Sequence, residues 1–321
     1  MEYKLDLKDK KLLYELDKDS RQNLTKLAKK LKLSKEVIYY RIKNLLDKNI
    51  ILKFHTVPAT YRFGQTAYKV YLKLHDISKI KYEELIEFLI KDKEIFWIGK
   101  CHGRWDLIFG IWANNIEEFF KAHDKVLEKF SKFIQEKELS ISRENIQYNR
   151  RWFYNEESSP KEFNFGEKEE KIKLDEFDKK IIQSILNNSR KKIVEIAYET
   201  KLSVDQVAYR LKKMENDKII KGYKCLFNVH KLGFVTTKSF VYFKNINEKK
   251  KKEFIDYFKK LSNTINFVIT FAPWDLEIMF ELESLDKHFE IMEEIKEKFN
   301  DLIRFYESVL IYEEPKQVFG K

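Results

Sequence analysis

Residues 33–41 have the sequence LSKEVIYYR, and residues 202–210 repeat its pattern as LSVDQVAYR. The same shift of 169 positions (202 minus 33) aligns much of the chain without a gap. It places Leu5-Asp6 on Leu174-Asp175, Ser20-Arg21 on Ser189-Arg190, Gly64 on Gly233, and Trp105-Asp106-Leu107 on Trp274-Asp275-Leu276. Because matched positions recur over almost half the chain, the sequence predicts one structural unit that occurs twice.

The first half of each unit has the spacing of a helix-turn-helix. In the first copy, apolar residues recur at helical spacing within 12–16, 24–31 and 37–46. Ser34 is a good N-cap for the last of these helices, and Ala28 is small where the second helix approaches it. Such a motif presents the start of its last helix to DNA bases, so we expect the reading residues there. They are Ser34, Lys35, Tyr39, Tyr40 and Lys43 in the first copy, and Ser203, Gln206, Tyr209, Lys212 and Lys213 in the second.

Three further features of this half bear on DNA binding. Arg41 and Arg210 fall close to the apolar stripe, so we expect each to pair with a nearby carboxylate rather than contact DNA. The β-rich runs 50–54 and 219–223 predict a wing beside each reading helix. Residues 3–57 contain 15 basic and 7 acidic residues, whereas 174–224 contain 12 and 8. The first module is therefore expected to dominate the salt-dependent affinity for DNA.

The second half of each unit alternates strands and helices. Residues 67–74 alternate as a half-buried strand, and 82–90 has helical spacing. Strands at 95–101 and 105–112, a helix at 116–130 and a strand near 138–146 complete the order β-α-β-β-α-β. This order predicts a ferredoxin-like domain, whose sheet carries helices on one face only. We expect the other copy to cover the bare face as an intramolecular pseudo-dimer, with a higher homo-oligomer left open.

The predicted fold class is α+β, with two winged helix-turn-helix domains alternating with two ferredoxin-like domains. Expected boundaries are 1–60 and 174–229 for the helix-turn-helix domains, and 61–150 and 230–321 for the ferredoxin-like domains. Between them, 151–173 is expected to be a linker, because Asn155 to Pro160 is polar and a charge-dense run follows it.

Composition limits the possible partners and compartment. The 321 residues carry a formal net charge of +11, which favours nucleic acid, although lysines scattered over solvated faces explain it equally well. Cys101 and Cys225 are not equivalent in the repeat, so no disulfide or metal framework is expected. A charged N-terminus and the lack of an apolar run of about 20 residues predict a cytoplasmic protein outside the membrane.

Both units resemble the Lrp/AsnC family of transcription regulators over nearly the whole chain. The most specific part is the series Leu5-Asp6, Asp9, Ser20-Arg21, Leu27-Ala28, Ser34, Tyr40-Arg41 and Ile50-Ile51, followed by the hairpin Gly103-Arg104-Trp105-Asp106. The resemblance implies a sequence-specific regulator that binds double-stranded DNA and responds to an amino acid or a related small molecule. It implies an effector site near the hairpin, at Gly103, Arg104, Asp106 and, in the second copy, Asp275. Simple turn formation by glycine and aspartate is the alternative.

The chain departs from the family at two places. The second hairpin, Ala272-Pro273-Trp274-Asp275, lacks the glycine, which puts its effector pocket in doubt. The family's glycine before the wing is replaced by Asn49 and Lys218, of which asparagine tolerates left-handed backbone better. The second copy is then a degraded reader, a reader of altered specificity or mainly a pairing partner.

Two other functions stay open. Siroheme decarboxylases resemble this architecture, and such an enzyme would use His102 and Arg104 with Asp106, or His55, as proton donors or carboxylate clamps. The sequence shows no Ser-His-Asp set, phosphate-binding glycine loop or zinc-ligand spacing, so we expect no catalytic residue, metal or cofactor. An architectural DNA-binding protein without an effector is the other alternative, and a ligand that alters DNA affinity would exclude it.

Overall fold

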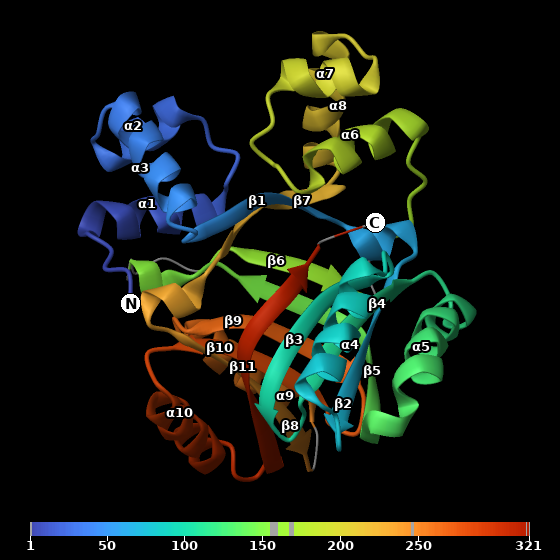
Figure 1. The fold of residues 1–321 in the computed structure, drawn as a ribbon. Coiled ribbons are helices and arrows are strands. Elements are labelled where there is room, and N and C mark those ends of the chain that lie inside the picture. Colours follow the sequence, from blue (N-terminus) through green and yellow to red (C-terminus); the bar gives the residue numbers. More distant parts are fainter. Residues whose placement is uncertain (1, 155–159, 167–169, 245–246, 319, 321) are drawn as a thin grey trace.

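The computed structural model describes residues 2–154, 160–166, 170–244, 247–318 and 320. Two helical modules stand at one end of the molecule, and a ribbon of paired strands lies beneath them (Figure 1). A larger sheet with outer helices forms the other end. The mixture of helices and strands confirms the predicted α+β class.

The helical modules begin where the sequence supplies caps. Asp6, Asn23 and Ser34 each accept a hydrogen bond from the backbone N–H three residues on, and Asp175 and Ser203 do the same in the second module. Apolar side chains on the inward helix faces form a core in each module. The helices are α1 (Leu7–Lys18), α2 (Leu24–Leu31), α3 (Lys35–Asp47), α6 (Glu176–Leu186), α7 (Ile193–Thr200) and α8 (Val204–Asn216).

The β-rich runs after α3 and α8 are strands, but each pairs with the strand of the other copy. β1 (Ile51–Pro58) runs antiparallel to β7 (Ile220–Phe227), with His55 opposite Lys224. These two residues are equivalent in the repeat, so a pseudo-twofold axis passes between them. A lone strand would leave its backbone groups unpaired, and the equivalent strand lies directly across the axis. The wing predicted beside each reading helix is therefore a ribbon that both modules share.

The two ferredoxin-like halves join edge to edge. The strand orders are β5-β2-β4-β3 and β11-β8-β10-β9, and the pairs β3–β11 and β9–β5 join them. Within the described residues, eight strands thus close a ring. The elements are β2 (Thr66–Leu74), α4 (Lys79–Lys91), β3 (Ile95–Gly103), β4 (Leu107–Ala113), α5 (Ile116–Phe130), β5 (Ile134–Tyr148), β8 (Val235–Phe243), α9 (Glu248–Lys260), β9 (Thr264–Phe271), β10 (Leu276–Leu282), α10 (Leu285–Lys298) and β11 (Ile303–Gln317).

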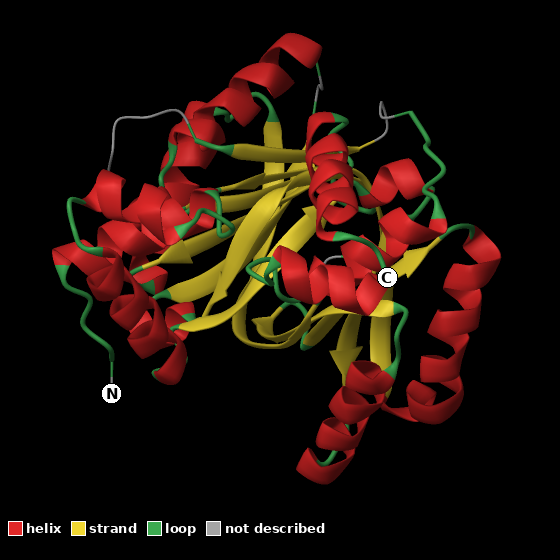
Figure 2. Ribbon diagram, turned by 90° about the horizontal axis from the view of Figure 1, so that it is seen from above, coloured by secondary structure: helices red, strands yellow, loops and turns green. Residues whose placement is uncertain are grey.

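Helices cover the outside of this ring, as the view from above shows (Figure 2). Outward side chains such as Val70 and Phe280 belong to the cores under α4, α5, α9 and α10. Successive side chains of a strand face opposite sides, so alternate residues point inward. Tyr71, Phe240 and Trp274 fill part of that interior. The faces of the two sheets that helices leave bare therefore line a common interior within one chain.

The stretch predicted to be a linker, 151–173, contains a strand. β6 (Glu162–Gly166) pairs with the end of β5, and Phe163 and Phe165 pack against Val57 of β1. Burial of these two aromatic side chains explains why a polar, charged stretch still adds to the sheet. Residues 155–159 and 167–169 of the expected linker lie outside the described residues.

The described residues contain neither a membrane-spanning helix nor a cluster of metal-binding side chains. Among them, no helix is both long and apolar enough to cross a bilayer. In the same residues, no group of three or more His, Cys, Asp or Glu side chains could hold a metal ion.

Candidate nucleic-acid interface and central cavity

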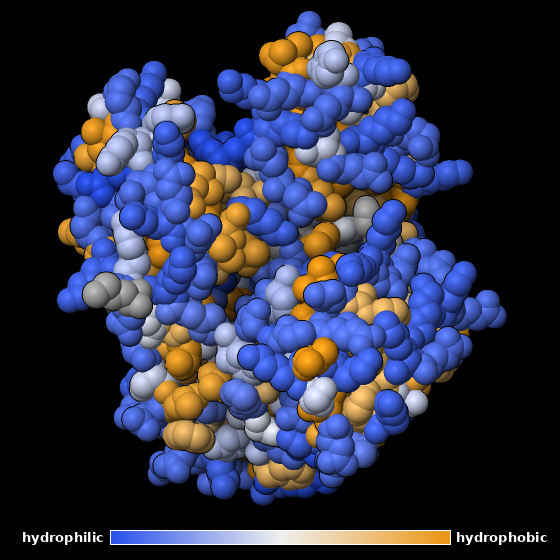
Figure 3. Space-filling model, in the orientation of Figure 1, coloured by the Kyte–Doolittle hydropathy of each residue, from blue (hydrophilic) through white to orange (hydrophobic). Residues whose placement is uncertain are grey.

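The residues predicted to contact DNA lie on exposed faces of α3 and α8. Tyr39, Tyr40 and Tyr209 leave 61%, 70% and 70% of their surface exposed. The predicted lysines of both helices are exposed as well. The two lobes that carry these helices stand apart and are largely hydrophilic on the face seen in Figure 3. Aromatic and lysine side chains that project from the same helix suit contacts with bases and phosphates.

Three of the predicted residues also serve the helices themselves. Ser34 and Ser203 are the N-caps of α3 and α8. In the second module, Gln206 Oε1 accepts the Ser203 N–H at 2.9 Å, which completes a capping box. The ten predicted residues are therefore placed where a reading helix needs them, and their contacts with DNA stay a prediction.

Arg41 and Arg210 occupy equivalent positions of the repeat, and each was expected to pair with a carboxylate. Arg41 Nη1 lies 2.8 Å from Asp6 Oδ2 and 2.7 Å from Asp9 Oδ1. Arg210 makes the equivalent pairs with Asp175 and Asp178, at 2.6 and 2.7 Å. Each arginine thus ties its reading helix to the first helix of the same module, and the expected pairing with carboxylates is confirmed.

The Ser-Arg pairs at 20–21 and 189–190 clasp the two modules together. Ser20 Oγ and Ser189 Oγ lie 2.7 Å apart, and both residues are fully buried. Arg190 donates to the carbonyls of Ser20 and Gln22 at 2.6 and 2.9 Å. Arg21 donates equivalent hydrogen bonds to the carbonyls of Ser189 and Lys191. This Ser-Arg clasp is reciprocal because equivalent residues meet on the pseudo-twofold axis.

Backbone hydrogen bonds attach the clasp to the ribbon. The N–H of Ser20 donates to the carbonyl of Tyr223 at 3.0 Å, and the N–H of Ser189 donates to Phe54 at 3.1 Å. Each module is therefore bound to the ribbon strand of the other copy. These contacts therefore fix the position of the module that carries α3 relative to the module that carries α8.

The backbone before each ribbon strand is left-handed. Asn49 and Lys218 have φ values of 52° and 55°. Both copies therefore keep the conformation for which the family uses glycine. This left-handed backbone conformation is sterically less favourable for lysine than for asparagine.

The hairpin residues proposed for an effector are used within the fold. Asp106 Oδ2 accepts the N–H of Leu74 at 2.8 Å, and Asp275 Oδ2 accepts the N–H of Phe243 at 2.7 Å. Arg104 pairs with Glu136 and lies over the Trp105 ring. These contacts favour the turn-forming interpretation of the hairpins. As effector contacts, Gly103, Arg104, Asp106 and Asp275 stay a prediction.

The backbone of Gly103 has a structural reason of its own. Its φ of 122° lies in the region that glycine favours, and a Cβ there would meet the Ser308 carbonyl at 2.9 Å. In the second copy, Ala272-Pro273 stands in its place, yet Asp275 makes the same bond as Asp106. The aspartate, rather than the glycine, is thus the shared structural feature of the two hairpins.

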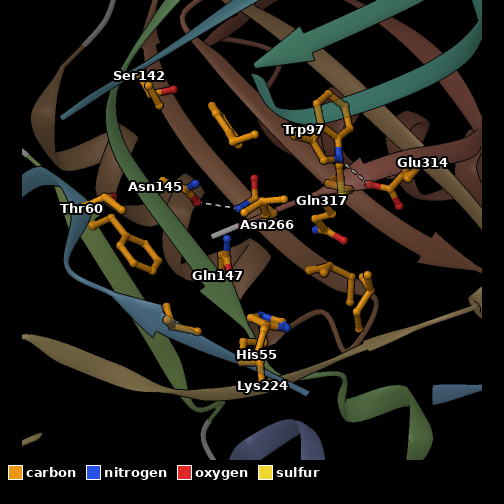
Figure 4. A pocket seen from close by; sticks show the side chains of 18 of the residues that line it. His55, Thr60, Trp97, Ser142, Asn145, Gln147, Lys224, Asn266, Glu314 and Gln317 are labelled. Carbon is orange, nitrogen blue, oxygen red and sulfur yellow. Dashed lines mark hydrogen bonds between the residues drawn. The ribbon is translucent and has the colours of Figure 1, made fainter. Parts of the chain in front are cut away.

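A cavity of about 140 Å³ lies on the pseudo-twofold axis, between the ribbon and the open end of the ring. We call it the axial cavity. His55 and Lys224 of the ribbon, Trp97 and Gln317 of the ring, and Asn145 and Asn266 from opposite halves project towards one another around it (Figure 4). The hairpins at Gly103 and Asp275 occupy the opposite ends of their strands. The axial cavity is therefore separate from the expected effector site.

The ribbon side of the axial cavity is cationic. Lys224 is 4% exposed, and its Nζ donates to the Tyr148 carbonyl at 3.0 Å. Burial lowers the pKa of this lysine to about 8. Burial, and then the charges of Lys224, Lys53 and Arg150, lower the pKa of His55 well below its usual value. The imidazole is thus neutral at pH 7, and a partner with negative charge is favoured beside Lys224.

The inner end of the axial cavity carries a buried charge cluster. Lys69 and Lys238 are equivalent in the repeat, and both pair with Glu277 Oε2, at 2.5 and 2.9 Å. Glu277 is 1% exposed, and the equivalent residue of the first copy is Ile108. Near the ribbon, Arg150 pairs with Asp17 and Glu281. Each of these three cations makes a direct ion pair with a carboxylate, whereas Lys224 makes none among the described residues, although the charges of Asp17 and Glu281 also act on it.

Comparisons with known proteins agree with the helical modules. A sequence family described as winged helix-turn-helix DNA-binding matches residues 5–51 and 174–221. An uncharacterized HTH-type transcriptional regulator of Pyrococcus furiosus is 36% identical over 128 residues, which are 39% of this chain and 82% of that protein. The chain belongs to the family of HTH-type transcriptional regulators. It contains the matched unit twice, so a relative with one unit matches less than half of it.

Two further comparisons concern a second relative and a solved structure. An uncharacterized HTH-type transcriptional regulator of Pyrococcus horikoshii is 32% identical over 117 residues, which are 36% of this chain and 77% of that protein. The crystal structure of the siroheme decarboxylase NirDL matches with a TM-score of 0.66 and covers 98% of this chain and 94% of that chain. At 13% identity, this second likeness shows a shared fold and nothing more.

Sequence reasoning found part of the axial cavity. It named His55 as a candidate but missed Lys224, Lys69, Lys238 and Glu277. The signal for Lys69 was present, because this lysine interrupts the otherwise apolar run from Ala67 to Leu72, whereas Lys238 lies between Thr237 and Ser239 and has no such signal. No local pattern marks Lys224, because its burial depends on the ribbon and the ring meeting.

Proposed function

We propose that this chain regulates transcription by binding double-stranded DNA through α3 and α8. The observation that carries this proposal is the Ser-Arg clasp, which holds two exposed reading helices in a reciprocal arrangement. A protein that read one site would not need its second module tied to the first. Response to an amino acid or a related small molecule, and a higher homo-oligomer, are further parts of the proposal.

The test is binding of the intact chain to a library of its own genomic fragments over a series of salt concentrations. Lys43→Ala removes an exposed lysine of α3, and Lys212→Ala removes its equivalent on α8. A lysine that contacts phosphate should contribute about one unit to the salt slope, so each substitution should weaken binding and lower that slope. We expect the larger loss for Lys43→Ala, because the first module is more basic.

Lys296→Ala is the matched control, since Lys296 is exposed on α10, away from both modules. It should bind like the unaltered chain. Equal losses for all three variants would mean that charge alone attracts DNA. Failure of the intact chain to select any fragment would count against the regulator and favour the architectural role.

A second candidate function, decarboxylation of a tetrapyrrole, has one observation in its favour. The fold matches NirDL over almost the whole chain, and His55, a candidate proton donor, lies at the axial cavity. Against it, a space of 140 Å³ is close to that which holds one benzene molecule, far less than a tetrapyrrole needs. Titration with iron-uroporphyrin decides: a shifted absorption spectrum and release of CO₂ would establish the enzyme.

A further inference from the structure

The axial cavity is asymmetric although the axis through it relates two similar halves. Equivalent positions around it hold different side chains: Trp97 and Asn266, Trp112 and Glu281, Asn145 and Glu314, Thr60 and Val229, and His55 and Lys224. The neighbouring clasp, by contrast, keeps serine and arginine in both copies. Joining two units in one chain allows such differences, since two identical subunits must present identical residues on an axis. An asymmetric site of this kind suits one asymmetric ligand per chain.

Buried polar atoms at the axial cavity lack partners among the described residues. The Thr60 hydroxyl and the Trp112 Nε1–H are both buried, and neither has a hydrogen-bond partner there. Thr60 is only 2% exposed. A buried donor without a partner destabilises the folded protein, so such groups normally form hydrogen bonds with something in the space they face. The Trp112 Nε1–H can only donate and the Thr60 hydroxyl can donate, so both suit acceptor oxygen atoms of a ligand, whereas Gln317 Oε1, which also lacks a partner among the described residues, suits a donor.

Charge points to the same ligand class. Arg150, Lys69 and Lys238 have carboxylate partners, whereas Lys224 Nζ bonds to a backbone carbonyl. The carboxyl group of Glu314 accepts a hydrogen bond from the Trp97 Nε1–H at 2.6 Å. Burial raises the pKa of Glu314, which favours its neutral form. Lys224 therefore makes no direct ion pair among the described residues, although the charges of Asp17 and Glu281 act on it, and it lies beside aromatic walls formed by Phe96, Trp97 and Trp112.

We propose that the axial cavity binds one small carboxylate per chain, with the carboxylate against Lys224 and the body of the ligand between the aromatic walls. The size of the cavity limits the ligand to roughly the volume of benzene with one or two polar groups. This site lies at the opposite end of the ring from the Gly103 and Asp275 hairpins.

The ribbon links this site to the reading helices. His55 and Lys224 lie on β1 and β7, and these strands follow α3 and α8 in the chain. A ligand that binds one arrangement of the ribbon better than another shifts the ribbon towards that arrangement. The spacing of α3 and α8 then changes with the ribbon. By linkage, DNA of the preferred spacing then raises the affinity for the ligand by the same factor. This coupling rests on the proposed function, whereas the binding site itself does not.

Benzoate is the probe, because it combines a carboxylate with a ring of the right size, and benzamide is its uncharged counterpart. Tryptophan fluorescence and calorimetry on the full chain, without DNA, measure the binding. We expect saturable binding of benzoate at one site per chain and at least about tenfold weaker binding of benzamide. Equal binding of the two compounds, or no binding of benzoate at millimolar concentration, would overturn the proposal.

Variants locate the site. Lys224→Met keeps the length of the side chain and should weaken benzoate binding at least about tenfold. Because Lys224 makes no direct ion pair among the described residues, its removal should not prevent folding. Thr60→Val introduces the residue that the second copy has at this position and should weaken binding roughly threefold. Lys296→Met, on the surface, should bind like the unaltered chain. Unchanged binding by Lys224→Met would place benzoate elsewhere and refute the site.

Measurements with DNA separate the two proposals. If benzoate binds at Lys224 and alters DNA affinity, the site and the coupling both stand. Binding at Lys224 with no effect on DNA affinity upholds the site and refutes the coupling. Selective DNA binding without any benzoate binding refutes the site and leaves the regulator in place.

Discussion

At the scale of single residues, one carboxylate compensates the charge of two buried lysines in the interior of the ring. Glu277 serves Lys69 and Lys238 at once, and it has no counterpart in the first copy, where Ile108 occupies its position. Burial opposes ionisation of Glu277, but Lys238 and Lys69 lower its pKa below the ordinary value. Two buried lysines without this carboxylate would carry an uncompensated charge.

Glu277→Ile therefore gives the second copy the residue of the first and should cost about 3–5 kcal/mol of unfolding free energy. Adding Lys69→Met and Lys238→Met to it should restore most of the loss, because no buried charge remains. Denaturant unfolding of the three proteins measures this. Since the folded pKa of Glu277 is lowered, its contribution is complete above pH 4.5 and is lost only in stronger acid. A small loss for Glu277→Ile would mean that water reaches the lysines.

At the scale of elements, the Ser-Arg clasp joins the turns after α1 and α6 to the ribbon. Its hydrogen bonds connect side chains to backbone carbonyls of the other module, so they hold the modules in place without being part of either core. The first module also shares its core with Cys225 and Phe227 of β7. Neither module is therefore an independent unit of packing.

Arg21→Met combined with Arg190→Met should lower the unfolding free energy by about 1–3 kcal/mol, because the carbonyls that accept from these arginines lose charged donors. Binding to DNA with two half-sites should fall more than binding to a single half-site, since the reading helices lose their fixed spacing. Gel shifts on both probes measure the difference. Arg304→Met, on an exposed part of β11, is the control. Parallel losses on both probes would show that the clasp affects folding alone.

At the scale of the whole molecule, equivalent residues meet along one axis from the clasp to the ring. Ser20 meets Ser189, His55 meets Lys224, and Lys69 and Lys238 share Glu277. Both reading modules stand on the same side of the ring (Figure 1). One chain therefore carries both reading modules in a pseudo-twofold arrangement.

This symmetry predicts two protected half-sites whose centres lie about one helical turn of DNA apart, about 10 base pairs, or a multiple of it. Footprinting of the intact chain on a selected fragment measures the spacing. Lys43→Ala should weaken protection at one half-site and Lys212→Ala at the other. One short footprint, insensitive to Lys212→Ala, would show that only the first module reads DNA.

The sequence by itself determined the duplication, the α+β class, the order of elements in each half and the pairing of Arg41 and Arg210 with acidic residues. These depend on spacing along the chain, and periods of 3.6 and 2 residues are visible in one dimension. The placement of the reading residues on exposed helix faces follows from the same periods.

The tertiary structure alone decided that the predicted wings form one shared ribbon, that the Ser-Arg pairs meet across the axis and that the expected linker contains β6. It also created the axial cavity, where Lys224 becomes buried only because β7 lies over the open end of the ring. Contacts between residues about 169 positions apart carry no local signal. Their free energy comes from surfaces that the chain brings together on folding, and neither surface shows its partner in its own sequence.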